Sequence, residues 1–410
     1  MRTVRSPQPR RTAGRALTTF LTTAALTTAA LAAGPLGSAS SAPLTTDSED
    51  LTRIDYRGHV FTVPDSWPIV DLKKHPDTCV RFDRHAVYLG SPGVHQNCPA
   101  RASGRTEALL IQPAPTAPKA VTENPTARTY RATGDRIVVT AAYGYDRSRI
   151  QDVLRSAGLP VATARVEAPV KRPAAAMLPA DATSYRGEGF DACTAPSQSA
   201  MDAWRDHSVY GAIGVYIGGI NRACAQQHLT AGWVRTQYAR GWRFFPLYVG
   251  RQPSSDGGSC GGGCAAITSP VSQGIAAADD AVKQAAALGF GKGTVIYDDL
   301  EHYESGGKVT DQVLTYVDAY TERLHALGYR SGAYGNTSSL VADLVANRNE
   351  VTLPDVLHFA RWNRVSSTSD ASIPSTMWSK HKRIHQYVGD TTETHGGVKI
   401  SIDRDRLDVD

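Results

Sequence analysis

From Tyr185 to the last residue, short apolar runs alternate with helix-like stretches, and this alternation constrains the fold more than any other feature. Eight runs are of strand type, among them "AIGVYIGG", "GTVIYDDLE" and "KISIDRD", and segments with helical character stand between them. Such alternation is typical of parallel strand and helix units. It predicts an α/β fold with a (β/α)8 TIM-type barrel over residues 185–410; a doubly wound open sheet is the alternative.

The chain before this region is organised differently. Residues 43–160 contain short β-rich runs such as "HVFTV", "EALLIQP" and "RIVVTAAYGY", followed by a helical stretch from Ser148 to Ala157. We therefore expect a small mixed α/β domain in front of the barrel. Residues 161–184 are rich in Pro and Ala and lack periodicity, which indicates a linker.

The first 42 residues have the three parts of a secretory signal peptide: a basic stretch, the apolar run Ala16–Ala33, and small residues near "GSAS". We expect cleavage after Ala39, with twin-arginine export through Arg10 and Arg11 as an alternative route. The mature protein is then secreted or associated with the cell wall. We expect no stable membrane insertion once the leader is removed.

The net charge of +5 comes from the leader. Without its five arginines, 39 basic residues face 39 acidic ones, so the mature chain has no net positive charge to attract phosphate backbones. We therefore expect no nucleic-acid partner. The five leader arginines are Arg2, Arg5, Arg10, Arg11 and Arg15.

Six cysteines in an exported chain indicate disulfides, because oxidising compartments preserve them. Cys79 and Cys98 lie in a segment without other cysteines, and we expect them to pair. The sequence leaves the pairing of the other four open. The run "CGGGC" lacks His and a second close Cys pair, so we expect a stapled glycine loop there, and no metal or cofactor. The remaining disulfide candidates are Cys193, Cys224, Cys260 and Cys264.

The run "TVIYDDLEHY" carries the strongest chemical signal. Side chains alternate along a strand, so Asp299 and Glu301 share one face with Val295 and Tyr297. Two carboxyl groups in one space are what glycosidic cleavage needs, since one donates a proton to the leaving oxygen and the other activates water or stabilises positive charge. An acidic strand end that meets solvent is the alternative interpretation.

Other polar and aromatic residues lie on or close to the ends of the predicted strands. Asp191 closes the first strand and Asp403 the last, and these strands are neighbours if the barrel closes. Aromatic faces next to amide and carboxylate groups are typical of a carbohydrate site, although each aromatic residue alone is more often explained by core packing. The candidate substrate-binding residues are Tyr216, Tyr248, Tyr334, Trp362, Asn363 and Gln386.

In their order along the chain, the motifs "GFDACTAPS", "YDDLEHY", "GAYGN", "FARWN", "HQY" and "SIDRDRLD" resemble those of a glycoside-hydrolase-like barrel family of secreted bacterial proteins. That family is itself similar to the family-25 glycoside hydrolases, the Chalaropsis-type lysozymes. The resemblance implies that Glu301 is the general acid and that Asp299 is the nucleophile or electrostatic stabiliser. It also implies supporting roles for Asp191 and Asp403.

Two functions are compatible with these observations. The first is a secreted, lysozyme-like glycoside hydrolase that acts on cell-wall or other polysaccharide, including peptidoglycan glycan strands. The second is a catalytically silent carbohydrate-binding or wall-organising protein that uses the same cleft. The distance and accessibility of the two carboxyl groups distinguish the two.

Overall fold

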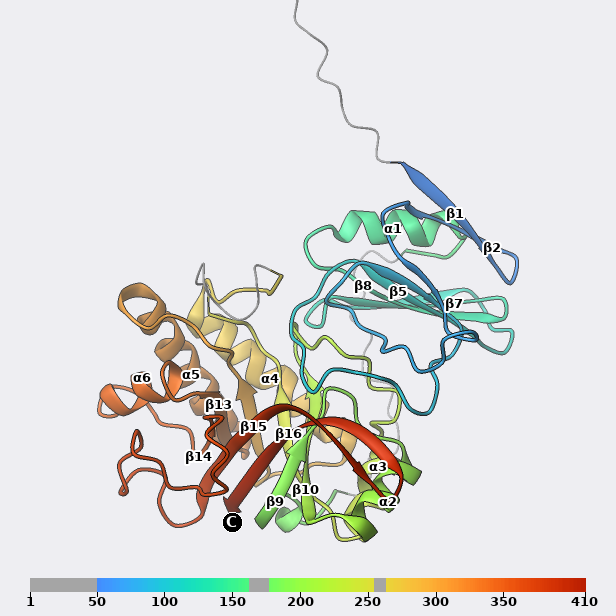
Figure 1. The fold of residues 1–410 in the computed structure, drawn as a ribbon. Helices are drawn as coiled ribbons and strands as arrows, with labels where there is room; N and C mark the ends of the chain where they lie inside the picture. The colour runs from blue at the N-terminus through green and yellow to red at the C-terminus, as the bar shows by residue number, and fades with distance from the viewer. Residues whose placement is uncertain (1–49, 162–176, 254–262) are drawn as a thin grey trace, which may run out of the picture. The chain divides into compact units, whose positions relative to one another are not determined.

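The computed structural model describes residues 50–161, 177–253 and 263–410, and Figure 1 shows the course of the chain. Contacts group the chain into two units, Met1–Ser48 and Glu49–Asp410. The predicted signal peptide, residues 1–42, lies outside the described residues, as does most of the predicted linker. Within the described ranges, no helix is both long and apolar enough to cross a membrane.

The N-terminal part, residues 50–161, is mostly β structure. A hairpin of β1 and β2 turns at Arg57 and Gly58, both with positive φ, and a six-stranded mixed sheet follows with the order β3-β4-β5-β8-β7-β6. The strands are β1 (Leu51–Tyr56), β2 (His59–Pro64), β3 (Ile69–Asp71), β4 (Ala86–Leu89), β5 (Ala108–Pro113), β6 (Ala120–Asn124), β7 (Thr129–Gly134) and β8 (Ile137–Ala142).

One α-helix, α1 (Arg147–Ser156), covers this N-terminal sheet. It begins at Asp146, whose carboxylate accepts a hydrogen bond from the Arg149 amide and so caps the first turn. Ile150, Val153 and Leu154 lie on one helical face and pack into the apolar core beside the strands. The helix lies within one residue of the boundaries predicted from the sequence.

Residues 185–409 form a closed barrel of eight strands. All neighbouring strands are parallel except at the last strand, β16, which runs antiparallel to both of its neighbours. In chain order the strands are β9 (Tyr185–Asp191), β10 (Tyr210–Gly218), β11 (Arg243–Tyr248), β12 (Val295–Asp299), β13 (Arg330–Asn336), β14 (Val356–Ala360), β15 (Lys382–His395) and β16 (Val398–Val409).

Helices connect only the first six strands of the barrel. The two longest, α4 and α5, both end at a glycine in the left-handed conformation, Gly289 and Gly328, which is the usual stop signal of a helix. The short 3-10 helix η1 (Ala180–Thr183) precedes β9. The α-helices are α2 (Gln198–His207), α3 (Ala231–Ala239), α4 (Pro270–Leu288), α5 (Gly307–Leu327) and α6 (Leu340–Ala346).

The prediction of a (β/α)8 TIM-type barrel is wrong. The fully described segment 361–381, between β14 and β15, contains no helix, and β15 and β16 form a long antiparallel hairpin. This hairpin turns at Gly396 and Gly397, both with positive φ, and a turn this short cannot make the crossover that parallel strands need. Because the sheet closes, the open doubly wound alternative is also wrong.

Two apolar clusters lie on opposite faces of the barrel strands. The inner cluster is drawn from the strands and their ends, whereas the larger outer cluster also contains residues of the helices. Strand β12 shows the alternation: Val295 and Tyr297 belong to the inner cluster and Ile296 to the outer one. The next inward position on β12 is Asp299, so an acidic residue follows the apolar filling of the barrel.

Candidate active site

Strand register brings Asp191 and Asp403 together. Asp191 ends β9, and Asp403 on the antiparallel β16 is its direct partner in the ladder. Both residues are fully buried. Gln386 of β15 bridges them, because its side-chain amide donates to Asp191 Oδ2 at 3.0 Å and to Asp403 Oδ2 at 3.2 Å. The two predicted supporting carboxyl groups thus share one donor.

Three aromatic side chains complete this arrangement. The Tyr216 hydroxyl donates to Asp191 Oδ1 at 2.8 Å. Gln386 Oε1 accepts two hydrogen bonds, from the Tyr334 hydroxyl at 2.9 Å and from the Trp362 indole at 3.0 Å. We refer to Asp191, Asp403, Gln386, Tyr216 and Tyr334 as the buried network.

A β-bulge adds one more donor to the buried network. The pairing of β15 with β16 shifts register between Val388 and Thr391, and Asp390 within this bulge has a φ of +49°. Its backbone amide donates to Asp403 Oδ1 at 2.6 Å. Next to the bulge, a side chain at Gly389 would collide with the Trp362 indole, so this glycine permits the close approach of Trp362.

Asp299 and Glu301 lie where β12 ends, and Gln252 fixes the backbone there. Its side-chain amide donates to the Asp299 carbonyl at 2.7 Å, and its carbonyl oxygen accepts from the Glu301 amide at 2.8 Å. Asp299 is 5% exposed, and among the described residues no hydrogen bond reaches its Oδ1 atom. Glu301 lies further out, and its side chain is 13% exposed.

Glu301 lines a small pocket of about 150 Å³. Arg101 of the N-terminal part lies opposite: its Nη1 is 3.9 Å from Glu301 Oε2, and its Nη2 is 3.9 Å from Asp390 Oδ2. The guanidinium carbon lies 4.5 Å from the centre of the Trp362 ring, a cation–π distance. Tyr334 and Asn336 also line the pocket. We refer to Arg101, Glu301 and Trp362 as the pocket wall.

Burial raises the pKa values of the carboxyl groups in this region. It raises the pKa of Asp191 to about 7, with a further contribution from Asp405. The pKa values of Asp299 and Asp403 are raised well above their usual range, first by burial and then by neighbouring carboxyl groups. Burial also raises the pKa of Glu301, but Arg101 acts against this shift. The buried carboxyl groups thus tend to keep their protons at neutral pH.

The family of the chain follows from comparison with known proteins. Residues 202–407, half of the chain, match the model of the Rv2525c-like, glycoside hydrolase-like domain. The chain belongs to this family. The predicted resemblance to the glycoside-hydrolase-like barrel family is therefore confirmed, while the relation to the family-25 lysozymes stays a prediction. A search of curated proteins found no match.

Solved structures give distant similarities to this Rv2525c-like protein. The Mycobacterium tuberculosis Tat-secreted protein Rv2525c in complex with L-tartrate is 14% identical, over 54% of this chain and 96% of that one, with a TM-score of 0.40. An uncharacterized B. stearothermophilus protein is 16% identical over 54% and 95%, at 0.36. The Streptococcus pneumoniae autolysin LytC with a synthetic peptidoglycan ligand is 12% identical over 69% and 57%, at 0.37. Scores this low support no argument.

Most of the site residues predicted from the sequence meet in or beside the buried network, but two do not. Tyr248 of β11 belongs to the outer cluster, and its hydroxyl donates to Asp280 of α4 at 3.0 Å. Asn363 is exposed in the segment after β14, and its side chain accepts from the Val365 amide at 2.9 Å. Neither residue lines the pocket that contains Glu301.

Sequence reasoning missed several residues of the Rv2525c-like site. Gln252 and Arg101 belong to no strand motif, and Arg101 lies outside the residues that match the family model. His358 of β14 was missed as well: its Nε2 lies 2.9 Å from Asp405 Oδ1, and both side chains are fully buried. Burial lowers the pKa of His358 to about 4 and raises that of Asp405, so the two form a neutral pair beneath the network.

Four of the described cysteines form two adjacent disulfides. The predicted Cys79–Cys98 bond is confirmed, and Cys193 pairs with Cys224. The sulfur atoms of Cys79, Cys98 and Cys224 lie within 4.8 Å of one another, but each belongs to a disulfide and so offers no thiolate to a metal. Cys264 is buried, and Cys260 lies outside the described residues.

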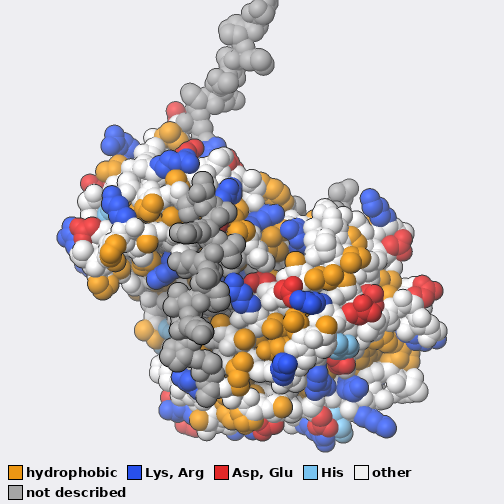
Figure 2. Space-filling view, turned by 180° about the vertical axis from the view of Figure 1, so that it is seen from behind, with side chains coloured by type: hydrophobic (Ala, Val, Ile, Leu, Met, Phe, Trp, Pro, Cys, Tyr) orange, Lys and Arg blue, Asp and Glu red, His pale blue; other side chains and the backbone are white. Residues whose placement is uncertain are grey.

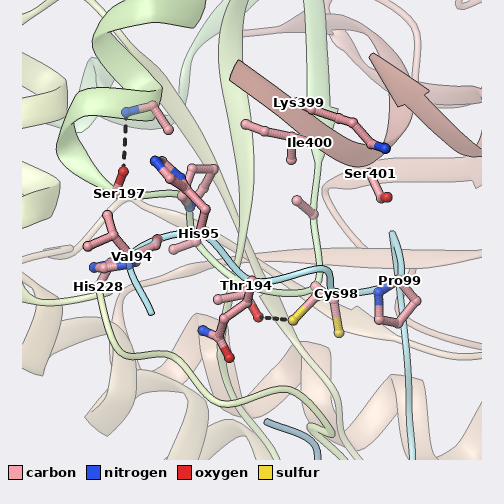
Figure 3. Close-up of a pocket in the computed structure, with 16 residues that line it drawn as sticks. Val94, His95, Cys98, Pro99, Thr194, Ser197, His228, Lys399, Ile400 and Ser401 are labelled. Atoms are coloured by element: carbon pink, nitrogen blue, oxygen red, sulfur yellow. Dashed lines mark hydrogen bonds between the residues drawn. The ribbon is translucent and has the colours of Figure 1, made fainter. Parts of the chain in front are cut away.

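A second pocket of about 50 Å³ lies next to these disulfides (Figure 3). The Thr194 hydroxyl donates to Cys98 Sγ at 3.2 Å, and Ser197 caps α2 by accepting from the Ala200 amide. Lys399, which also lines this pocket, is exposed. The Thr194–Cys98 bond joins the N-terminal part to the segment before α2, which is a structural role.

Proposed function

We propose that the protein is an exported glycoside hydrolase that acts on cell-wall or other polysaccharide. The observation that carries this proposal is the position of Glu301, which lines a pocket directly beside a buried cluster of carboxyl groups. A proton donor for a glycosidic oxygen must be reachable by substrate and must hold its proton near neutral pH. Burial, which raises the pKa of Glu301, supports that role.

The other carboxyl groups take different parts in this proposal. Asp299 is the inner partner of Glu301. Once Asp299 has lost its proton, its carboxylate stabilises the positive charge that develops at the sugar. Its Oδ1 atom, which is buried and accepts no hydrogen bond from the described residues, supports this role, because no protein donor competes for its charge. Asp191 and Asp403 position Gln386, and Gln386 in turn holds Tyr334 and Trp362 at the pocket. All of these roles are assigned to side chains of this protein.

One observation favours the alternative, a catalytically silent carbohydrate-binding protein. Arg101 lies 3.9 Å from Glu301 and also covers the Trp362 ring, where a sugar would stack. A cation at this distance favours the ionised form of Glu301, which cannot donate a proton. A protein with this pocket could bind glycan without cleaving it.

The deciding experiment measures reducing-sugar and muropeptide release from a panel of bacterial walls and soluble glycans. It compares the mature protein with the variants Glu301→Gln and Glu304→Gln. Glu304 is the matched control, because it lies three residues away with an 82% exposed side chain. Loss of product only in Glu301→Gln, by about 10²–10⁴-fold, is expected for a general acid. Glycan pull-down by all three proteins without product would support the silent binder instead.

We also propose that the protein is secreted or wall-associated and that polysaccharide or peptidoglycan glycan strands are its partners. The disulfides support an oxidising compartment. The surface gives no support to nucleic-acid binding: on the face in Figure 2, Lys and Arg side chains are interspersed with acidic and hydrophobic ones and form no single basic stripe. Detection of the mature protein in culture supernatant or wall fractions tests the location.

A further inference from the structure

Arg101 reaches the pocket from the segment between β4 and β5, which no family motif covers. Contacts on both sides of Arg101 hold this segment against the barrel. Three residues earlier, Cys98, which is disulfide-bonded to Cys79, accepts a hydrogen bond from the Thr194 hydroxyl at 3.2 Å. Three residues later, the Gly104 amide donates to the Asn221 carbonyl at 2.8 Å, and Arg105 Nε donates to the Ile220 carbonyl at 3.3 Å. The position of Arg101 is therefore set by the fold.

Among the described residues, the guanidinium group of Arg101 has no hydrogen-bond partner, so its hydrogen-bonding capacity is available within this part of the chain. Its plane packs over Trp362, and its two contacts with Glu301 and Asp390 are 3.9 Å long. Such contacts attract electrostatically but are too long to be hydrogen bonds. The side chain is 31% exposed and lines the pocket. A guanidinium placed like this presents a planar set of N–H donors to whatever enters.

We propose that Arg101 contacts the substrate and selects glycans that carry a carboxylate next to the bond that Glu301 serves. A guanidinium fork matches the two oxygens of a carboxylate and binds them with paired, charge-assisted hydrogen bonds. Asp299 and Asp403 compete weakly for Arg101, because burial keeps them largely protonated. Glu301 and Asp390 face Arg101 at 3.9 Å without direct hydrogen bonds, so a carboxylate that forms such bonds can replace these contacts. Only the position of the reacting bond rests on the proposed function; the anion-binding role of Arg101 does not.

Binding of an acidic sugar at Arg101 has a consequence for Glu301. In the free protein, Arg101 opposes the rise in the pKa of Glu301, while Asp390 favours the rise and His302 opposes it. A carboxylate bound to Arg101 neutralises the guanidinium charge and weakens its hold on ionised Glu301. Glu301 then keeps its proton more readily, so the substrate that Arg101 selects also prepares the proton donor.

Sodium D-glucuronate is the probe, with D-glucose as the neutral control. Binding is followed through the indole N–H resonance of Trp362 in NMR titrations of the mature protein. We expect glucuronate to shift this signal with an affinity at least tenfold weaker in Arg101→Ala, and intermediate in Arg101→Lys, which keeps the charge but loses the fork. Arg84→Ala removes an exposed arginine of the same N-terminal part and is the matched control.

The proposal is overturned if glucuronate leaves the Trp362 signal of the wild-type protein unchanged, or if Arg101→Ala binds it as tightly as wild type. Equal unfolding midpoints of the variants show that the fold is intact. The result also separates the two proposals. Glucuronate binding without glycan cleavage refutes the hydrolase and leaves the role of Arg101 intact. Glycan cleavage with the same preference for acidic glycans in Arg101→Ala and in wild type supports the hydrolase and refutes the role of Arg101.

Discussion

The buried network and the pocket wall lie side by side but are built differently. In the buried network, direct hydrogen bonds of 2.6–3.2 Å satisfy both oxygens of Asp191 and Asp403. In the pocket wall, Arg101 contacts Glu301 at 3.9 Å and lies over the ring of Trp362, a residue that is 45% exposed. The first arrangement resists change because each lost bond leaves a buried polar group unsatisfied. The second can exchange its contacts for those of a ligand.

This difference indicates separate roles for the two regions: the buried network positions side chains, and the pocket wall meets the ligand. Gln386 is the link, because it bonds both network carboxyl groups with its amide nitrogen and holds Trp362 through its oxygen. We conclude that the buried network sets the place of the aromatic face, while Glu301 and Arg101 meet the ligand. Substitutions in the buried network should then lower mainly the stability of the fold, whereas substitutions in the pocket wall should lower mainly binding or activity.

The largest effect on stability is expected from Gln386→Ala. The substitution removes the shared donor of Asp191 and Asp403 and the acceptor of Tyr334 and Trp362, and it leaves a cavity in the barrel. We expect a loss of about 4 kcal/mol in the free energy of unfolding, measured by chemical denaturation. Gln151→Ala, which removes one bond to the Tyr130 hydroxyl in the N-terminal part, should cost about 1 kcal/mol. Equal losses in both variants would contradict the central role of Gln386.

The pH dependence of stability tests the network next. Burial raises the pKa of Asp191 from 3.8 to about 7, so between these values the folded state holds a proton that the unfolded state releases. The stability that comes from this group is therefore present at low pH and is lost as the pH rises through that window. Asp191→Asn removes the dependence. The free energy of unfolding of Asp191→Asn minus that of wild type should rise by about 1.4 kcal/mol between pH 5 and pH 6.

Denaturation of both proteins at several pH values checks this expectation, and parallel profiles would count against a buried, protonated Asp191. Asp299, Asp403 and Asp405 also have raised pKa values and contribute in the same direction. Asp191 helps to raise the pKa values of Asp299 and Asp403, so Asp191→Asn weakens their contribution as well and enlarges the expected difference. His358, whose pKa is lowered by burial, contributes with the opposite sign.

The sequence predicted much of the site because strand periodicity is local. The period of two placed Asp299 on the inner face of β12 after Val295 and Tyr297, as the inner cluster shows. The same rule applied to β11 would have excluded Tyr248, since Phe245 and Leu247 face inward and the next residue must face α4.

Other features depend on contacts between distant parts of the chain. Arg101 reaches Glu301 from the N-terminal part, and no spacing rule relates the two positions. The TIM-type prediction failed for a different reason: the run after Gly397 was counted as one more parallel unit, although the short Gly396–Gly397 turn allows only a hairpin. Because β16 runs antiparallel, Asp403 lies in the middle of its strand, opposite the end of β9, rather than at the end of its strand.

The smallest effect is expected from a pair of tyrosine variants that lose the same atom on opposite faces of the barrel. Tyr334→Phe removes a donor to Gln386, and Tyr248→Phe removes a donor to Asp280. Each should cost about 1 kcal/mol of unfolding free energy, because one hydrogen bond is lost in each. Only Tyr334→Phe should weaken glucuronate binding, since the hydroxyl of Tyr334 helps to orient the amide that holds Trp362. NMR titration of both variants checks this expectation. Weaker binding in Tyr248→Phe would show that Tyr248 contributes to the site despite its outward position.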